Sequence, residues 1–273
     1  MFSRLRRLVR EHPVIAFYAL AFPLSWRAYL TALFHPPTEL GLDPYGPLVA
    51  AVLVTELAGG LEGLKTWGRS LLRWRAAPVL YAFALLVPLL ATLVGIAINV
   101  ALGAASPPPE TWRAWPSALL AFPFVMVLGG PLGEEPAWRG LALARMAERR
   151  SMLQASLAVG LVWFAWHLPL LLARPGEVAP GLIGIVSASV VFSWLWQASG
   201  RVVLLPLLMH TAQNTFGGEF AGPMFSGTDV TRLSWIRGGL YLLVALFLVL
   251  RDARLRATPA ERAPELARPR VAA

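Results

Sequence analysis

Two adjacent acids, Glu134 and Glu135, lie in a part of the chain whose neighbouring stretches are almost wholly apolar, and Arg139 follows four residues after the second acid. A carboxylate is costly to place in the hydrocarbon of a membrane, so an acid there is a candidate functional residue that needs a partner. Within a helix Glu135 and Arg139 share a face, whereas Glu134 points about 100° away from Glu135. The spacing predicts a structural ion pair between Glu135 and Arg139, and it leaves Glu134 as the reactive carboxylate.

The residues around the acids interrupt a regular helix. Pro131 and Gly133 loosen the helix just before the acids. Pro136 suits the first turn of a helix that restarts there, because the missing N–H of proline is no loss at that position. The alternative interpretation is that the three charged side chains form a buried cluster that only locks helices together.

His167 is a candidate partner for Glu134. If the two segments that flank residues 150 and 151 form an antiparallel hairpin, Glu134 lies 16 residues before Arg150 and His167 lies 16 residues after Ser151. At ~1.5 Å rise per residue, both are ~24 Å from the turn and therefore at the same depth. A single histidine in such a segment is more often a hydrogen-bonded packing residue, so the equal depth is what favours a shared site.

His210 and Asn214 are four residues apart and share one face of a helix. An isolated pair of this kind more often supplies hydrogen bonds between helices. Together with Glu134 and His167, however, the pair allows two chemistries that both hydrolyse a peptide bond.

In the first chemistry, Glu134, His167 and His210 bind zinc and leave a fourth position for water. In the second, Glu134 is a general base for a water molecule that His167 orients, and His210 with Asn214 stabilises the oxyanion. The patterns H-E-x-x-H and G-x-S-x-G are absent, and the sequence does not choose between the two chemistries.

The composition indicates that a membrane surrounds these residues. Of the 273 residues, 57% are hydrophobic and only 14% are charged, and several segments reach the ~20 apolar residues that span a bilayer. The net charge of +9 is concentrated in the connections and at the termini, with no nucleic-acid-binding motif, so we expect no nucleic-acid partner. The chain has no cysteine, which excludes disulfides and thiolate chemistry.

We predict an all-α, polytopic transmembrane bundle in one domain, residues 1–256, followed by a disordered tail, residues 257–273. Eight apolar segments can be drawn, at about 14–34, 46–63, 78–103, 116–142, 152–173, 180–199, 202–218 and 234–250. Residues 64–75 fit either an amphipathic helix at the membrane surface or an ordinary basic loop. Arg27 and Glu56, in the first two segments, could pair with each other.

The distribution of arginine predicts the orientation. With the N-terminus in the cytoplasm, the inner connections carry most of the arginine and the outer ones carry single cations. An even number of spans then places both termini inside, in a cytoplasmic (plasma) membrane that we expect to be bacterial.

At these residues the chain resembles the CPBP family of intramembrane proteases, which includes type II CAAX prenyl proteases and bacterial relatives linked to bacteriocin processing or immunity. The family motifs E-E-x-x-x-R and H-x-x-x-N match at Glu134 to Arg139 and at His210 to Asn214. The motif F-x-x-x-H matches at His167 but has Trp163 in place of phenylalanine. We expect this change to affect packing more than chemistry.

The resemblance covers about 116–218 and implies roles for these residues. Glu134 is the base, His167 binds its water or a metal, and His210 with Asn214 binds a metal or the oxyanion. The implied function is an intramembrane endopeptidase, with a peptide or membrane protein as substrate and with zinc as a conditional cofactor. The alternatives are a non-proteolytic immunity or interaction protein with the same fold, and a transporter, which the lack of an internal repeat disfavours.

Overall fold

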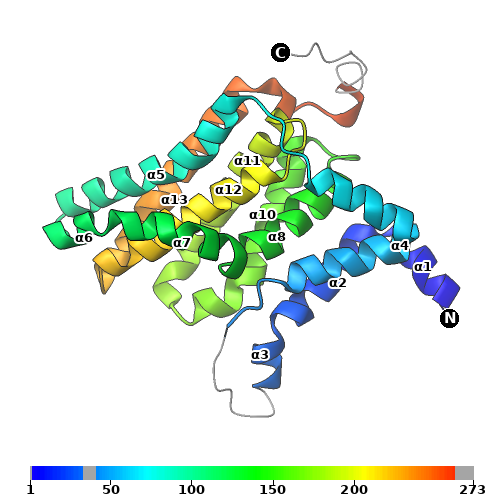
Figure 1. The fold of residues 1–273 in the computed structure, drawn as a ribbon, viewed down its shortest axis with the longest axis horizontal. Coiled ribbons are helices and arrows are strands. Elements are labelled where there is room, and N and C mark those ends of the chain that lie inside the picture. The colour runs from blue at the N-terminus through cyan, green and yellow to red at the C-terminus, as the bar shows by residue number, and fades with distance from the viewer. Residues whose placement is uncertain (1, 33–40, 262–273) are drawn as a thin grey trace.

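The computed structural model describes residues 2–32 and 41–261, and every regular element in these ranges is a helix (Figure 1). The predicted all-α class is therefore confirmed. In chain order the elements are α1 (Phe2–Glu11), α2 (Pro13–Ser25), α3 (Arg27–Thr31), α4 (Gly46–Leu71), α5 (Pro78–Ala101), α6 (Pro109–Arg113), α7 (Trp115–Leu128), α8 (Pro131–Ala137), the π-helix η1 (Trp138–Leu143), α9 (Ala144–Met146), α10 (Met152–Leu172), the 3-10 turn η2 (Pro175–Glu177), α11 (Val178–Ala198), α12 (Leu204–Ala212), the π-helix η3 (Gln213–Phe220), the 3-10 turn η4 (Gly222–Met224), α13 (Thr228–Arg251) and the 3-10 turn η5 (Ala253–Leu255). Most of the predicted disordered tail, residues 262–273, lies outside the described residues.

Five helices in the described ranges are long and apolar enough to cross a membrane: α4, α5, α10, α11 with η2, and α13. A sixth span results if α7 and the helix that follows it, Pro131–Met146, count as one span bent by 50°. The predicted count of eight is not confirmed. The predicted segment 14–34 is divided into α2 and α3, of 13 and 5 residues, and segment 202–218 is divided into α12 and η3.

The first segment is interrupted because another part of the chain contacts it. The Asp43 N–H donates to the Ser25 carbonyl at 2.9 Å, which occupies an oxygen that would otherwise continue the helix. Gly46, the first residue of α4, lies so close that a Cβ there would be 2.2 Å from the Ser25 hydroxyl oxygen. This contact holds the residues before α4 over the centre of the bundle.

The second segment is longer than predicted. Helix α4 continues to Leu71 through a kink at Gly60, whose φ of +63° suits glycine. Residues 64–71 are therefore helical, as the amphipathic-helix alternative required. The suggested pairing of Arg27 with Glu56 is wrong: Arg27 pairs with Asp43 at 2.8 Å, and Glu56 pairs with Arg6 at 3.3 Å.

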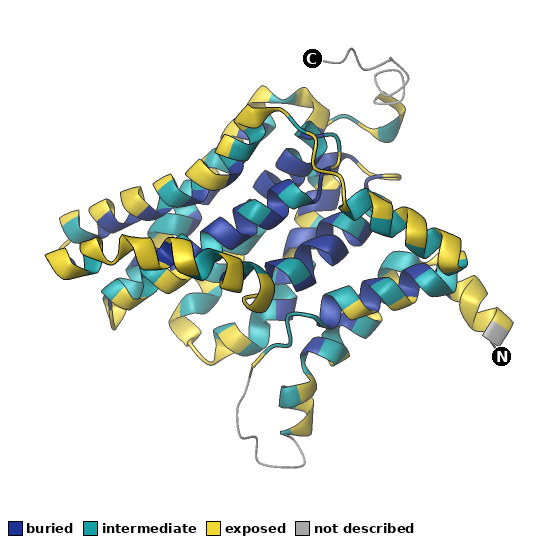
Figure 2. Cartoon of the chain, viewed as in Figure 1, coloured by how far each residue is buried: buried dark blue, intermediate teal, exposed yellow. Residues whose placement is uncertain are grey.

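Helix α11 lies at the centre of the bundle and packs against both α10 and α13, while α12 packs against α5, α7, α8 and α11. Figure 1 shows α2 and α4 on one side of this group and α5 with α13 on the other. Buried residues gather on the central helices in Figure 2, whereas large apolar side chains remain exposed on α5, α7 and α13. An exposed apolar surface of this kind is expected where helices face lipid. The membrane orientation stays a prediction.

Candidate active site

The chain breaks between α7 and α8, just before the two acids. Gly130 has a φ of +109°, a conformation that glycine adopts easily. Its carbonyl accepts the N–H of Glu134 at 2.9 Å, and a Cβ at this position would be 2.5 Å from Glu134 Oε1. Pro131 is the first residue of α8, where its missing N–H costs nothing. The helix therefore restarts at Pro131 rather than at Pro136, and the restart places Glu134 in the first turn.

Glu134 is buried, with 3% of its surface exposed. Its Oε2 accepts two indole N–H groups, from Trp163 at 2.7 Å and from Trp138 at 3.3 Å. Its Oε1 accepts no hydrogen bond from the residues that the structure describes. One carboxylate oxygen is therefore held in place, and the other is available to a water molecule or a substrate.

Trp163 occupies the position where the family motif has phenylalanine, and it hydrogen-bonds Glu134 as well as packing; that the change affects packing more than chemistry stays a prediction. A phenyl ring has no N–H, whereas the Trp163 indole donates to the acid across 29 positions of the chain. The same side chain contacts the rings of His167 and His210, at centroid distances of 5.6 and 5.3 Å. Trp163 therefore contacts three of the predicted site residues, Glu134, His167 and His210.

Glu135 and Arg139 form the ion pair that their spacing predicts, at 2.9 Å, with both side chains fully buried. The guanidinium also lies over the rings of Trp163 and Phe192, at 4.5 and 4.9 Å from their centroids. Such a contact adds attraction for a cation that has been removed from water. The charge of Arg139 is thus balanced by one carboxylate and two aromatic faces.

His210 donates to Glu135, a bond that the sequence did not predict. Its Nδ1 is 2.9 Å from Glu135 Oε1, the same oxygen that Arg139 contacts. A carboxylate accepts, so Nδ1 carries the proton, and Nε2 of the neutral ring keeps its lone pair. Glu135 therefore orients His210 as well as balancing Arg139.

The ring of His167, on α10, is oriented through its Nδ1 atom, as the ring of His210 is. Its Nδ1 lies 2.9 Å from the Trp163 carbonyl oxygen, one turn earlier on the same helix. A carbonyl only accepts, so Nδ1 again carries the proton and Nε2 is left free to accept.

Asn214 lies in the π-helix η3, so its position relative to His210 is not that of a regular α-helix. Its Nδ2 donates to the Gly129 carbonyl at 3.2 Å. One amide hydrogen is used in this bond, and the second remains for another acceptor.

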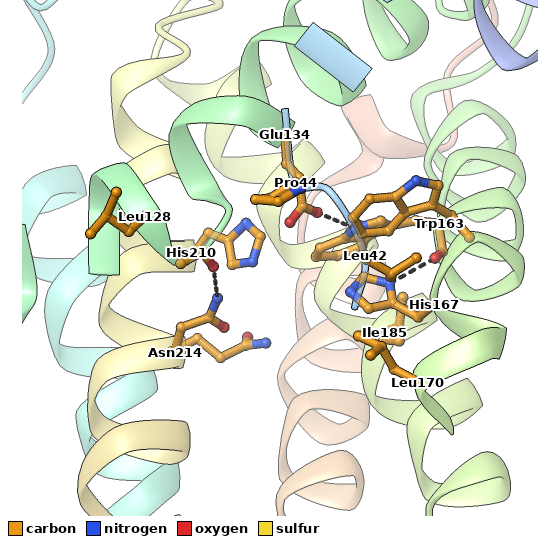
Figure 3. Close-up of a pocket in the computed structure, with 13 residues that line it drawn as sticks. Leu42, Pro44, Leu128, Glu134, Trp163, His167, Leu170, Ile185, His210 and Asn214 are labelled. Carbon is orange, nitrogen blue, oxygen red and sulfur yellow. Dashed lines mark hydrogen bonds between the residues drawn. The ribbon is translucent and has the colours of Figure 1, made fainter. Parts of the chain in front are cut away.

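Glu134, His167, His210 and Asn214 line a single cavity of about 370 Å³, which we call the Glu134 cavity. The other side chains that line it include Leu42, Pro44, Trp163, Trp166, Ile185 and Gln213. Figure 3 shows His210 and Asn214 on one side of the space and His167 with Trp163 on the other. The four residues predicted to carry chemistry thus line one cavity. Glu135 and Arg139 are fully buried and are not among the residues that line it.

The residues before α4 close over this cavity. Gly133 allows the approach, because a Cβ there would be 2.2 Å from the Pro44 carbonyl oxygen. Leu42 and Pro44 therefore reach the cavity although they precede Glu134 by about 90 positions in the sequence.

Zinc binding by Glu134, His167 and His210 stays a prediction. In the described part of the chain, no group of three or more His, Asp or Glu side chains is placed to hold a metal ion. The two histidines do have the outer hydrogen bonds that metal-bound histidines usually make. Of the Glu134 carboxylate, Oε2 is held by the two indoles, whereas Oε1 accepts no hydrogen bond from the described residues.

Three contacts of the two acids were missed from the sequence, those of Glu134 with Trp138 and Trp163 and that of Glu135 with His210, and only the contact with Trp138 left a signal. Trp138 lies four residues after Glu134, so helical spacing alone could have indicated its contact with the acid. The bond between His210 and Glu135 joins positions 75 residues apart, and no local pattern indicates it.

Residues 116–216 match the family described as type II CAAX prenyl endopeptidase Rce1-like. A curated protein of Methanococcus maripaludis named CAAX prenyl protease 2 is 24% identical over 143 residues, which are 48% of this chain and 50% of that protein. The chain thus matches about half the length of this relative. All three motifs fall inside the residues that match the family. These matches confirm the resemblance to the CPBP family, which includes the type II CAAX prenyl endopeptidases, over the part of the chain that carries the three motifs.

Proposed function

We propose that the chain is an intramembrane endopeptidase that hydrolyses a peptide bond in the Glu134 cavity, with Glu134 as the base that activates water. The observation that carries the proposal is the state of the Glu134 carboxylate. One oxygen is fixed by Trp163 and Trp138, and the other faces no donor of the described residues. A general base needs such a free acceptor within hydrogen-bond reach of water.

The two histidines and Asn214 complete the arrangement. Nε2 of His167 accepts a hydrogen from the attacking water and so orients its oxygen. Asn214 offers its second amide hydrogen to the oxyanion. His210 donates from Nε2 in the doubly protonated form of its ring, while Nδ1 keeps its bond to the Glu135 carboxylate.

The reaction then balances without a further reactant. Glu134 takes a proton from water while the water oxygen bonds to the carbonyl carbon, and the carbonyl oxygen becomes the oxyanion. When the tetrahedral intermediate collapses, the C–N bond breaks, and Glu134 returns the proton to the departing nitrogen. The products are a carboxylic acid and an amine.

The names of the family and of the relative suggest the class of substrate. The Methanococcus maripaludis protein is named as a prenyl protease, so a peptide that carries a lipid near its C-terminus is the first candidate substrate. We propose that such a peptide enters from the membrane, whose apolar interior suits a lipid-bearing chain.

The test is cleavage of labelled peptides, with and without a prenyl group, by the purified protein in lipid nanodiscs. We expect cleavage that persists in a metal chelator and is lost in Glu134→Gln. The control is Glu148→Gln, which removes an exposed acid that pairs with Arg145 at the surface. A chelator-sensitive reaction would contradict the metal-free base. No cleavage of any peptide would favour a non-proteolytic immunity or interaction protein instead.

A further inference from the structure

A second cavity adjoins the first. It has a volume of about 150 Å³ and lies between α11, α13 and η3, and we call it the Arg237 cavity. Ile185 and Gln213 line both cavities, so the two cavities lie next to each other. The polar side chains that line it are those of Glu177, Gln213, Ser234, Arg237 and Tyr241.

Arg237 lies within the predicted last span, 234–250, and belongs to none of the motifs described above. Its NH1 donates to the Gly217 carbonyl at 3.1 Å. The guanidinium lies so close to Gly217 that a Cβ there would be 1.8 Å from NH2. In the described part of the chain, no carboxylate pairs with Arg237 within 4.0 Å. An intramembrane cation without an acid is by default a functional-site hypothesis.

The polar atoms around this cavity lack partners. Arg237 Nε, the Tyr241 hydroxyl and Gln213 Oε1 are all buried, and none of them makes a hydrogen bond. Buried polar atoms in native proteins nearly always have a hydrogen-bond partner, so each unpaired atom needs an explanation, such as a ligand that binds there. The guanidinium and the hydroxyl both donate, and both are satisfied by an acceptor that enters the cavity.

The depth of Arg237 disfavours a lipid phosphate as this acceptor. Arg237 is nine residues from Thr228, the first residue of α13, which corresponds to ~14 Å along a helix with ~1.5 Å rise per residue. The helix has 24 residues, so Arg237 is near its middle rather than at the level of the headgroups.

Glu177 also lines the cavity, but its Oε1 accepts the Thr231 hydroxyl at 2.9 Å. Glu177 is therefore not an ion-pair partner of Arg237, and its negative charge disfavours the binding of another carboxylate in the cavity. The bond to Thr231 holds Glu177 to α13.

We propose that Arg237 and Tyr241 bind a carboxylate of the substrate peptide while its scissile bond lies in the Glu134 cavity. The planar guanidinium fork matches a carboxylate, which accepts two parallel hydrogen bonds. The carboxylate comes either from the C-terminus of the peptide or from an acidic side chain. This inference rests on the proposed peptidase function, because it names a feature of the same substrate.

The test is peptide binding to the inactive Glu134→Gln protein, which is independent of cleavage. The probe is a fluorescent apolar hexapeptide in four forms: a free C-terminus, a C-terminal amide, and each of these with an internal Asp. We expect a carboxylate form to bind about tenfold or more tighter than the uncharged form, because hydrogen bonds to a charged group are the stronger ones. The form that binds tightest identifies the source of the carboxylate.

The variants test whether Arg237 causes the preference. The ratio measured is the affinity for the carboxylate form divided by the affinity for the uncharged form. Adding Arg237→Gln is expected to reduce this ratio to about one. Arg251→Gln, which removes an exposed cation at the end of α13, is expected to leave the ratio unchanged. Tyr241→Phe, which removes only the hydroxyl, is expected to reduce the ratio severalfold and serves where Arg237→Gln does not fold. Glu177→Gln is expected to increase the ratio.

Equal binding of the charged and uncharged forms, or a preference that survives Arg237→Gln, would overturn the carboxylate site. If anionic lipid in the nanodisc raises the melting temperature only when Arg237 is present, and the peptides bind equally, the ligand is a lipid phosphate and the proposal fails. A preference without cleavage by the active protein contradicts the proposed function alone. Cleavage without a preference contradicts this inference alone.

Discussion

At the scale of single residues, two adjacent glutamates have different surroundings. Glu134 receives two indole N–H groups on one oxygen, whereas Glu135 receives a guanidinium and an imidazole on one oxygen. Each acid keeps one oxygen without a partner among the described residues, but Glu134 lines the cavity, whereas Glu135 Oε2 is buried and Glu135 is not among the residues that line it. The proposed chemistry depends on this difference.

Trp163→Phe tests the contact that departs from the family motif. It restores the family residue but removes the shorter of the two hydrogen bonds on Glu134. We expect kcat to fall about tenfold or more with a smaller change in KM, because a hydrogen bond to a charged group contributes about 1.5–3 kcal/mol. Steady-state kinetics with a cleaved peptide provide the measurement.

The control for this variant is Trp166→Phe. Trp166 is also buried, but its indole N–H has no partner, so the change removes a similar volume without a hydrogen bond. An equal loss of kcat in both variants would attribute the effect to packing and contradict the role of the bond.

Glu135→Gln tests the second acid through stability. The change leaves the buried Arg139 without its carboxylate, and breaking a buried pair in this way costs about 3–5 kcal/mol. We expect a clear fall in the melting temperature of the purified protein, whereas Glu148→Gln at the surface changes it little. A melting temperature equal to that of the wild type would show that the pair is not structural.

At the scale of elements, the site is formed where regular helices are interrupted. Glu134 follows the break between α7 and α8, Arg139 lies in the π-helix η1, and Asn214 lies in the π-helix η3. π-helical turns occur often at functional sites, because they direct side chains away from the regular helical faces. The i,i+4 pattern predicted the partner of Glu135, but it could not predict these changes of helix type.

Gly130→Ala tests the break before Glu134. The residue has a positive φ, and the added Cβ would meet Glu134 Oε1. We expect a loss of stability of about 1–3 kcal/mol from the backbone and a large loss of activity from displacement of the acid. Peptide cleavage and thermal unfolding are measured on the same preparation.

Gly103→Ala is the matched control. Gly103 also has a positive φ, of +97°, but a Cβ there meets nothing within 4 Å. We expect a similar loss of stability without the loss of activity. If both variants lose activity equally, strain rather than contact with Glu134 explains the effect.

The end of α13 supports a prediction about pH. The pKa of Asp252 is lowered, first by the hydrogen bond from Arg254 and also by the Trp194 indole N–H, which joins the end of α13 to α11. A lowered pKa means that this carboxylate stabilises the fold above its ordinary value of 3.8 and loses that effect as the pH falls below it.

Asp252→Asn is therefore expected to lower the stability of the protein at neutral pH. As the pH falls below about 5, the variant is expected to lose less stability than the wild type, as measured by thermal unfolding. An unchanged slope in this range would show that Asp252 does not contribute to it.

At the scale of the whole molecule, the sequence predicted the class of the fold and the members of the site better than their contacts. Apolar segments and arginine-rich connections indicated a helical membrane bundle. The motif spacing indicated which side chains meet, and Glu134, His167, His210 and Asn214 do line one cavity. The eight predicted spans were not confirmed, because Asp43 and Gly46 contact the end of α2 and interrupt the first segment.

The contacts that were missed connect distant parts of the chain. The bonds of Trp163 to Glu134 and of His210 to Glu135 depend on how helices pack, and local periodicity contains no information about that packing. Arg237 was visible as a cation in an apolar segment, but only the folded structure shows that no acid among the described residues pairs with it.

The most direct measurement is the catalytic efficiency of the wild type and of Glu134→Gln toward one cleaved peptide, in the same nanodiscs and with equal melting temperatures. The glutamine keeps the shape of the side chain and removes the base. We predict that kcat/KM falls about 10²–10⁴-fold, the usual contribution of a positioned general base. A fall of less than about threefold would contradict the assignment of Glu134 as the base, because the loss of a base costs far more than that.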